Sequence, residues 1–393
     1  MFEIIEKQEL DTIIKVVGVG GAGSNAVDHM IRENVQGVEF IAANTDAQAL
    51  NKNLAPCKLE LGKQSQQGQG AGSQPEVGKQ AAEENREAIK KQLEGAHMVF
   101  ITAGMGGGTG TGAAPVFAEV ARELGILTVG VVTKPLHLEG RTRTRNAEAG
   151  VVELTKHVDS LIVVLNDKLD EVLGEDASFK DCLKAADDVL KNAVGGIAEI
   201  ITGHGYINVD FADIRTVMSE KGRAMMGSAI ASGQDRASIA AKQAVASPLL
   251  EGVNLSGARG IIVNVTASSD MKKREINEAL ATVKAFAAED AHVIFGAVFD
   301  DSMGDQLRVT VVVTGLGQAA AAPVLTVIEN PQQAKGTGTY GPGHAGGGDD
   351  GWSDLDKPTV LRRPPRGASV VAAMKNSGVD PYDIPAFLRK QAD

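Results

Sequence analysis

At 393 residues and a net charge of −11, the chain is long enough for two or more domains and too acidic for nucleic acid to be its main partner. No apolar run approaches the roughly 18 residues that a membrane span requires, and the start of the chain lacks a signal peptide's basic and apolar regions. Two cysteines and seven scattered histidines show no disulfide framework and no metal-ligand spacing. We therefore expect a cytoplasmic protein without a metal held by its own side chains.

The first 200 residues alternate apolar, β-branched runs with helical patterns. The expected strands are 13–19, 38–43, 97–102, 127–133 and 160–166, and the expected helices between them lie near 24–34, 76–93, 113–124 and 140–157. Strands that are apolar on both faces and alternate with helices predict a parallel sheet with helices covering both faces. Right-handed crossovers then bring the loops after the strands to one edge of the sheet, where such folds bind ligands.

A first glycine-rich loop follows the first expected strand. In VVGVGGAGSNAV, residues Gly18, Gly20 and Gly23 have the G-x-G-x-x-G spacing that lets a backbone approach a phosphate at a helix N-terminus. The spacing fits a dinucleotide-binding Rossmann unit, and Asp46 stands where such a unit places its ribose contact. This loop alone leaves a dinucleotide and another phosphate ligand equally open.

A second loop, GMGGGTGTG from Gly104 to Gly112, follows the strand 97–102 and precedes a helix. Two opposed loops lined by backbone amides suit a chain of phosphates held from both sides, and Thr109 and Thr111 would add hydroxyl donors. Because the loop has no lysine, backbone dipoles, a bound metal and an arginine would have to neutralise the phosphates. A third loop, GQGAGS at 68–73, is either a plain surface loop or a contact for the terminal phosphate.

A long helical pattern at 179–202 comes next, and GHGYINVDFAD ends it before a short helix. A second unit then runs from about Gly222 to Leu316. It has helices near 234–246 and 272–288 and strands at 260–267, 292–299 and 308–315, which predicts a smaller α+β domain. The carboxylates of NVDFAD by themselves fit a loop that ends in a helix cap.

After Gly317 the composition changes, because eight of the 13 prolines lie there together with GTGTYGPGHAGGGDDG. Such a segment buries too little apolar surface to offset its chain entropy, so we expect it to be disordered. It ends in DPYDIPAFLRKQAD, an apolar helical tip that suits a groove on another protein. The alternative for this tip is a frayed chain end. The residues expected to bind the partner are Asp383, Ile384, Pro385, Phe387 and Leu388.

Five segments together resemble the FtsZ family, the tubulin-like GTPases of bacterial cell division: VGVGGAGSNAV, GGGTGTG, NVDFAD, TVMSEKGRAMMGS and the terminal DIPAFLRK. The resemblance covers nearly the whole chain and is weakest from about 318 to 375. It implies an α/β, tubulin-like fold. The implied parts are an N-terminal GTP-binding domain with a Rossmann-like parallel sheet (1–177), a central helix (178–203), a catalytic loop and short helix (204–221), an α+β C-terminal domain (222–317), a disordered linker (318–379) and a partner-binding peptide (380–393).

The resemblance also implies a GTP site. The positions that would line the phosphates are Gly20, Gly21, Ala22, Gly23, Ser24, Asn25, Gly107, Gly108, Thr109 and Gly110, with Ala71 and Gly72 near the γ-phosphate. Glu139 and Arg143 would hold ribose and phosphate. Asn166 and Asp187 would read guanine, because a carboxylate can accept hydrogen bonds from its N1–H and its exocyclic amine. The sequence departs from the family at Leu183, where many members have an aromatic residue, at LHLEG and at Ala22.

Asn208, Asp210 and Asp213 would be catalytic. Two acids beside a triphosphate in the same subunit would repel it, and the resemblance instead places them at the far end of the long helix. In a head-to-tail pair they would meet the next subunit's γ-phosphate. A contact of this kind propagates as a filament, so hydrolysis would occur only at assembled interfaces.

The implied ligands are GTP and GDP, with Mg²⁺ bound alongside the nucleotide. The implied partners are further copies of the chain, and membrane-anchoring adaptors and regulators that bind the C-terminal peptide, with the membrane reached only indirectly. The implied location is the mid-cell division ring beneath the inner membrane. Two alternatives stay open: an NAD-dependent oxidoreductase built on the first loop and Asp46, and a tubulin-like scaffold that binds GTP without useful turnover.

Overall fold

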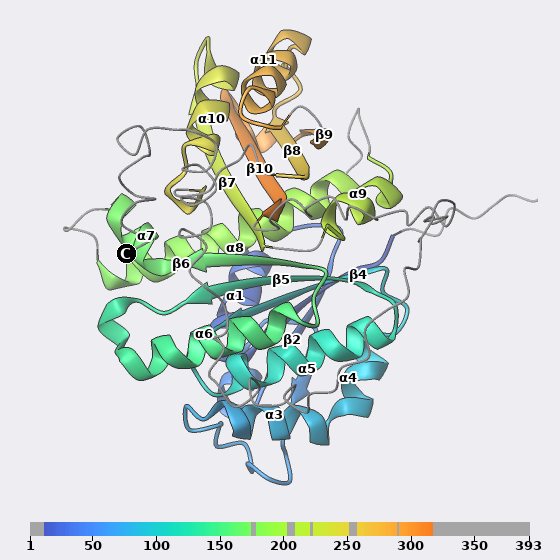
Figure 1. Ribbon diagram of the computed structural model, residues 1–393, viewed down its shortest axis with the longest axis vertical. Helices are drawn as coiled ribbons and strands as arrows, with labels where there is room; N and C mark the ends of the chain where they lie inside the picture. The colour runs from blue at the N-terminus through green and yellow to red at the C-terminus, as the bar shows by residue number, and fades with distance from the viewer. Residues whose placement is uncertain are drawn as a thin grey trace, which may run out of the picture. The chain divides into compact units, whose positions relative to one another are not determined.

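The computed structural model describes residues 12–173, 178–202, 209–220, 223–250, 258–288 and 291–316 (Figure 1). Within them, ten strands form one sheet in the order β3-β2-β1-β4-β5-β6-β7-β10-β8-β9. The strands are β1 (Ile14–Val19), β2 (Glu39–Asn44), β3 (Cys57–Glu60), β4 (Met98–Gly104), β5 (Leu127–Lys134), β6 (Ser160–Leu165), β7 (Arg223–Ser232), β8 (Gly260–Ala267), β9 (His292–Phe299) and β10 (Gln306–Leu316). The expectations for the linker and the terminal peptide lie outside the described residues.

The helices and 3₁₀ turns connect these strands. They are α1 (Gly20–Arg32), α2 (Ala47–Lys52), α3 (Pro75–Glu84), α4 (Arg86–Leu93), α5 (Thr109–Glu123), η1 (His137–Glu139), α6 (Arg141–Thr155), α7 (Asn166–Leu173), α8 (Phe179–Thr202), α9 (Phe211–Met218), α10 (Arg236–Val245), η2 (Pro248–Leu250), α11 (Lys273–Lys284) and η4 (Asp301–Met303). Among the described helices, none combines the length and the hydropathy that a bilayer crossing demands.

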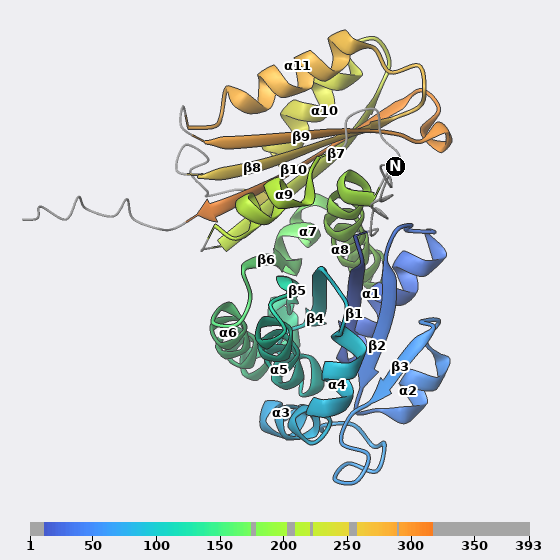
Figure 2. The same ribbon diagram turned by 90° about the vertical axis from the view of Figure 1, so that its right-hand side faces the viewer.

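The six N-terminal strands are parallel and have helices on both faces, as the apolar runs predict. Successive residues of β1 show why the strands are apolar throughout. Val16 belongs to the core shared with α1 and α8, whereas Val17 belongs to the core shared with α3, α4, α5 and α6. Figure 2 shows the strands between these two helical layers.

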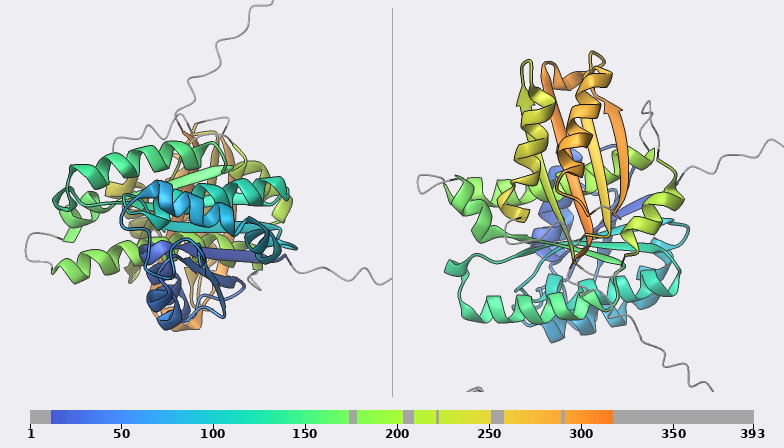
Figure 3. Two further views of the ribbon diagram at one scale, coloured as in Figure 1. Left: turned by 90° about the horizontal axis from the view of Figure 1, so that it is seen from below. Right: turned by 45° about the horizontal axis from the view of Figure 1, so that its top comes forward.

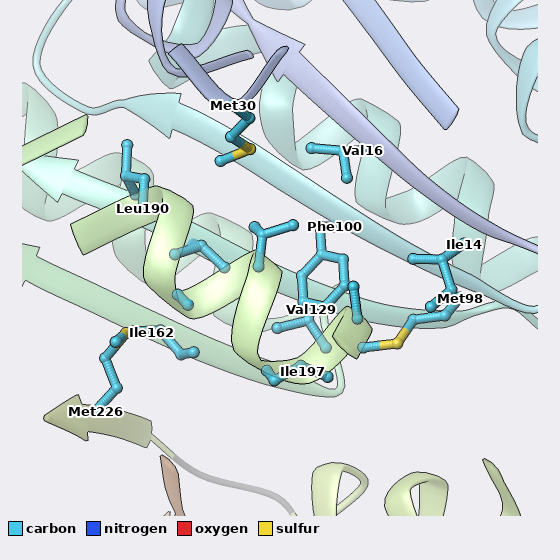
Figure 4. Close-up of a cluster of buried hydrophobic side chains, with 14 of the residues drawn as sticks. Ile14, Val16, Met30, Met98, Phe100, Val129, Ile162, Leu190, Ile197 and Met226 are labelled. Atoms are coloured by element: carbon cyan, nitrogen blue, oxygen red, sulfur yellow. The ribbon is translucent and has the colours of Figure 1, made fainter. Parts of the chain in front are cut away.

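The long helix α8 packs over the middle of the parallel strands. Figure 4 shows Ile197 of α8 beside Phe100 and Val129 of the sheet, and Leu190 of α8 and Met30 of α1 belong to the same cluster. These side chains are fully or almost fully buried. Because α8 has 24 residues, it spans about 36 Å, enough to run from the carboxyl ends to the amino ends of the parallel strands.

The C-terminal strands carry their own two-helix layer. Strands β7, β10 and β8 are antiparallel neighbours, β9 lies parallel to β8, and α10 and α11 pack side by side over them (Figure 3). The sheet continues from the parallel half through only two residue pairs between β6 and β7, Leu161–Arg223 and Ile162–Ala224. The second unit is therefore joined to the first by a strand pairing as well as by α8.

Some elements differ from the sequence-based expectation. Helix α1 begins at Gly20 rather than at 24, and α5 begins at Thr109 rather than at 113, so both glycine loops supply the first turns of helices. The expected helix 76–93 is divided at Asn85, whose side chain accepts a hydrogen bond from the Gly62 amide at 2.8 Å. That contact replaces a regular helical turn with a bend.

Candidate functional site

A cavity of about 460 Å³ opens at the carboxyl ends of β1, β4, β5 and β6. This is the edge where parallel sheets of this kind bind ligands, and the volume suits a nucleotide-sized molecule. The predicted residues that line it are Gly21, Ala22, Asn25, Gly107, Gly108, Thr109, Gly110, Glu139, Arg143, Asn166 and Asp187. The structure thus brings together residues separated by up to 166 positions in the chain.

Two helix N-termini meet at the cavity. Neither Val19, the N-cap of α1, nor Gly108, the N-cap of α5, offers a side-chain hydrogen bond to the first turn. The first N–H groups of both helices therefore lack side-chain caps, and the partial positive charge of both helix ends is directed toward the cavity. Such paired ends favour an anion with several oxygens, such as a polyphosphate.

Glycine is required where these loops contact each other. A Cβ on Gly20 would lie 2.7 Å from the Gly110 nitrogen, and one on Gly104 would lie 2.6 Å from the Ala22 Cβ. By contrast, Cβ atoms on Gly21 and Gly107 would meet nothing within 4 Å. The first two glycines hold the loops together, whereas the second two leave open space over their backbones for a ligand.

The threonine hydroxyls have different surroundings. Thr109 lines the cavity, and its Oγ1 lies 2.6 Å from Oγ1 of the buried Thr45. Thr111 does not line it, because its hydroxyl accepts a hydrogen bond from the Gly106 amide at 2.8 Å and so braces the loop from within. The expectation that Thr111 faces the phosphates is therefore wrong. The Ser24 hydroxyl, in the first turn of α1, is buried without a hydrogen-bond partner.

Residues 68–73 brace the second glycine loop. Ala71 is buried, and a Cβ added to Gly108 would lie 2.8 Å from the Cβ of Ala71. Gly72 has a φ of +55° with open space around it. Neither residue lines the cavity as it stands, and neither do Gly20, Gly23 and Ser24.

The other end of the cavity carries the charged and amide side chains. Asn166, the first residue of α7, has a buried Oδ1 atom without a hydrogen-bond partner. Arg143 pairs with Glu139 one helical turn earlier. Asp187 faces the cavity from α8, together with Leu183, whose side chain is 44% exposed. Orphaned acceptors and a carboxylate suit a ligand that presents N–H donors.

The pKa of Asp187 is raised to about 6, mainly by burial; His29 opposes the rise and the neighbouring Asp188 adds to it. A carboxylate poised in this way titrates close to neutral pH. A perturbed carboxylate inside a cleft is a frequent property of functional sites.

Asp46 is engaged elsewhere. It is the N-cap of α2, and its Oδ1 accepts from the amides of Gln48 and Ala49 at 2.9 and 3.0 Å. It does not line the cavity. The ribose contact that an NAD-dependent oxidoreductase would need is thus missing at this position.

Asp210 and Asp213 lie far from the cavity. They open α9, where Arg215 donates to the Gly125 carbonyl at 2.8 Å and the ring of Phe211 contacts the ring of His97. His97 immediately precedes β4 and Gly125 lies two residues before β5, so α9 lies at the amino ends of strands whose carboxyl ends form the cavity. In Figure 1, α7 and α9 flank opposite ends of α8. Asn208 and the five tail residues expected to bind a partner fall outside the described residues.

Gly104 and Met105 belong to the predicted second loop, whereas four lining residues went unpredicted: Thr133, Pro135, Ala186 and Leu190. Thr133 and Pro135 follow from the rule that ligands bind beyond the carboxyl ends of parallel strands, since β5 ends at Lys134. Ala186 and Leu190 belong to α8, and their position depends on how α8 crosses the sheet. No local sequence signal marks them.

Comparison with known proteins gives the class first. Residues 13–174 match the Tubulin/FtsZ family, GTPase domain, and residues 222–317 match the FtsZ family, C-terminal domain. The chain is a tubulin-like GTPase, and the predicted α/β, tubulin-like fold is confirmed. CetZ2 from Haloferax volcanii shares this fold at a TM-score of 0.65 and 20% identity, covering 79% of this chain and 95% of that one.

Closer relatives narrow the class. The chain is 52% identical to cell division protein FtsZ of Pseudomonas aeruginosa and 50% identical to that of Coxiella burnetii, over 100% and 99% of both chains respectively. The solved FtsZ dimer of M. jannaschii matches at a TM-score of 0.76 and 43% identity, over 78% of this chain and 89% of that one. The chain belongs to the FtsZ family. It is thus a cell-division GTPase of the tubulin-like cytoskeleton, as the motifs predict.

Proposed function

We propose that the chain hydrolyses GTP within head-to-tail filaments of the bacterial division ring, at a site that two neighbouring subunits build together. The observation that carries the proposal is the separation of the two halves of this site. From Asp187 at the cavity to the end of α8 at Thr202, the helix alone covers about 22 Å. Asp210 lies beyond that end, so it cannot reach a nucleotide in its own subunit's cavity.

The nucleotide would lie with its phosphates between the two glycine loops and its base against α8. The uncapped first turns of α1 and α5 would donate to phosphate oxygens, with Asn25 and the Thr109 hydroxyl beside them. Arg143 would leave Glu139 to share its charge with the phosphates. Asp187 and the unpaired Asn166 oxygen would accept hydrogen bonds from the guanine edge.

Ala71 and Gly72 would act at the γ-phosphate. They brace the loop around Gly108, and a small shift of the Gly72 backbone would direct its amide toward a third phosphate. Gly20, Gly23 and Ser24 would act through the first turn of α1. The Ser24 hydroxyl, buried and unpaired, is a donor that a ligand at this turn would satisfy.

Mg²⁺ fits this site as a companion of the phosphates. It prefers oxygen ligands and retains several waters. The carboxylates that line the cavity in the described chain, Glu139 and Asp187, belong to its base end, so phosphate oxygens, water and the Thr109 hydroxyl would hold the ion. The ion supplies charge compensation for the phosphates.

The acids of the neighbouring subunit would complete the reaction. One oxygen of Asp210 accepts from the Ala212 amide at 3.2 Å, which orients the carboxylate at the exposed start of α9. Asp213 stands in the same exposed first turn. Phosphoryl transfer depends mainly on positioning and charge compensation, so carboxylates that orient a water against the γ-phosphate suffice. Each added subunit buries one nucleotide and presents one new cavity, which extends a filament.

Sedimentation with GTP and Mg²⁺ tests the proposal, with GDP, ATP and NAD as controls and released phosphate followed in parallel. Only GTP should drive sedimentation, and phosphate release should begin above a threshold protein concentration. Turnover proportional to protein concentration from the lowest values would show that one subunit suffices.

The remaining parts of the chain extend the proposal to the cell. We assign residues 1–177 to GTP binding, 178–203 to the connecting helix, 204–221 to the catalytic loop, 222–317 to the C-terminal domain, 318–379 to a linker and 380–393 to adaptor binding at the mid-cell membrane. Deleting 380–393 should leave GTPase activity intact and abolish binding to membrane adaptors. A truncated protein that loses GTPase activity would contradict this division of labour.

A further inference from the structure

A polar contact joins the two helices that flank the nucleotide cavity. On α1, Nε2 of His29 lies 2.7 Å from Oδ1 of Asp188 on α8. The His29 side chain is 13% exposed and the Asp188 side chain 40% exposed, so the imidazole is the more shielded partner of the pair. Glu33, one turn after His29, pairs with Lys191, one turn after Asp188, at 3.4 Å. A hydrogen bond and, one turn further, an ion pair therefore bridge α1 to α8.

His29 also lies behind Asp187. A second hollow, of about 360 Å³, is lined by both His29 and Asp187, and it shares Asn25, Leu183 and Asp187 with the nucleotide cavity. Asp187 therefore forms part of the wall between the two spaces. The base end of the cavity lies on one side of this wall, and the imidazole lies on the other.

The same two helices carry the two halves of nucleotide recognition. The first turn of α1 contributes to the phosphate end of the cavity, and α8 contributes Asp187 at the base end. A nucleotide of fixed length can satisfy both ends only if the two helices keep one separation and rotation. Shared burial of Met30 and Leu190 sets their distance, but apolar contacts of this kind tolerate sliding. A directional hydrogen bond to a carboxylate fixes the register.

We propose that His29 is a positioning residue for guanine recognition, which through Asp188 holds α8 so that Asp187 presents both carboxylate oxygens to the base. This inference rests on the proposed guanine contact of Asp187. Asp188 is acceptor-only when ionised, so Nε2–H of His29 donates.

Other charged groups surround His29. From α8 these are Asp187, Asp188 and Lys191, with Lys180 and Lys184 lining the same hollow, and from α1 they are Asp28, Arg32 and Glu33. Asp28 is engaged with the Leu54 amide at 2.6 Å and with Arg32 at 3.9 Å. Asp188 is thus the acceptor that His29 uses. A protonated His29 also adds a positive charge beside Asp187, which lowers the pKa of that carboxyl.

The test measures the affinities of the full chain for GDP and IDP. IDP lacks the exocyclic amine, so the ratio of the two affinities reports the second hydrogen bond to Asp187. A hydrogen bond to a charged group should make this ratio about tenfold or more in the wild-type protein. His29→Ala should reduce the ratio severalfold, mainly through weaker GDP binding, whereas a change that merely loosens the fold would weaken both nucleotides equally.

Matched variants sharpen the test. His29→Gln keeps a donor toward Asp188 and should restore most of the ratio at pH 8, while the pH at which GDP affinity falls moves upward because a positive charge is lost. Arg32→Gln, one turn along α1 and well exposed, should leave the ratio unchanged. If thermal melting shows His29→Ala to be unfolded, Asp188→Ala, which removes the acceptor, takes its place and should lower the ratio in the same way.

Two failures are distinguishable. A wild-type preference for GDP over IDP that survives intact in a folded His29→Ala protein would overturn the positioning role and leave the proposed function standing. A wild-type protein with no preference for GDP over IDP or ADP would instead overturn the guanine contact of Asp187 itself.

Discussion

At the scale of single residues, two neighbouring glycines in one loop are needed for different reasons, one for packing and one for ligand access. Gly106 has a φ of +106°, and a Cβ there would lie 2.8 Å from the Arg143 carbonyl oxygen. Gly107, the next residue, faces open space in the cavity. The first allows α6 to pack against the loop, and the second lets a ligand approach the backbone. The sequence GMGGGTGTG shows only that both positions lack a side chain.

Asp187 predicts a pH dependence of nucleotide binding. Its pKa of about 6 lies above the ordinary value of 3.8 because the carboxyl is buried. Only the ionised form accepts both donors of guanine, so protonation competes with binding, and GDP affinity should fall about tenfold from pH 7.5 to pH 5. Calorimetry over this range measures the effect. Asp187→Asn is the control, since its profile retains the titration of the phosphates and lacks that of the carboxylate; identical profiles would refute the role.

Asp210 caps α9 and has a proposed catalytic role, and two substitutions separate the cap from the catalytic role. Asn is as good an N-cap as Asp, so Asp210→Asn should keep the melting temperature and GTP affinity while turnover falls by about 10²-fold or more. Asp210→Ala should also lose the cap of α9, at a cost of about 1 kcal/mol in the free energy of unfolding. Melting curves and phosphate release distinguish the two effects. Near-normal turnover in Asp210→Asn would rule out a catalytic charge.

At the scale of elements, the contact between α3 and α5 depends on a glycine. A Cβ on Gly112 of α5 would lie 1.9 Å from the Pro75 carbonyl oxygen at the start of α3. The helices approach so closely that only a hydrogen fits between them. The same approach holds α3 beside the loop around Gly108, since a Cβ on Gly78 would meet the Gly108 carbonyl oxygen at 2.5 Å.

Two glycine-to-alanine substitutions should therefore have opposite signs. Gly112→Ala should lower stability by roughly 1–3 kcal/mol, because overpacking forces α3 away. Gly195→Ala in α8 should raise it by about 0.5–1 kcal/mol, because its Cβ meets nothing nearer than 3.9 Å and alanine favours the helix. Denaturant titrations of the two variants measure both. A destabilised Gly195→Ala would show that α8 tolerates no added atom there.

The sequence predicted the elements with strong periodicity and missed those that depend on partners. Helix α8 matches its expected bounds, 179–202, because its apolar stripe is long and continuous. Strand β7 was missed because RAMMGSAIAS is poor in β-branched residues. Its small residues follow from packing, since a Cβ on Gly227 would lie 2.0 Å from the Ala244 carbonyl oxygen of α10.

The candidate site divides in the same way. The glycine loops can be recognised from their local sequence. The roles of Thr111, which stabilises the loop, and of Asp46, which caps a helix, depend on hydrogen bonds that residue spacing does not reveal. Family resemblance was needed to single out Asp187. In the sequence Asp187 looks like any other charged residue on a helix. It differs because it is buried against the cavity, and only the folded structure shows this.

At the scale of the whole molecule, α8 runs between two different surfaces of the subunit, one with the nucleotide cavity and one with the acids of α9. The nucleotide cavity lies toward its amino-terminal part, and the acids of α9 follow its carboxyl-terminal end, at the opposite edge of the parallel strands. In the proposed mechanism, neither end alone would hold a complete site. This polarity is the central claim, because it makes hydrolysis a property of the contact between subunits.

A mixing experiment tests that claim most directly. Asp210→Asn should bind GTP but lack the Asp210 charge. Gly107→Asp should keep both acids but repel phosphates, since its new side chain enters open cavity space. Each protein alone should be nearly inactive. Mixed, they should release phosphate well above the sum of the two, because the GTP-loaded end of one meets the intact acids of the other. A mixture of Asp210→Asn with the double variant, Gly107→Asp and Asp210→Asn, should gain nothing. Absence of any gain at every ratio, with both single variants folded and GTP bound to the first, would contradict a site shared between subunits.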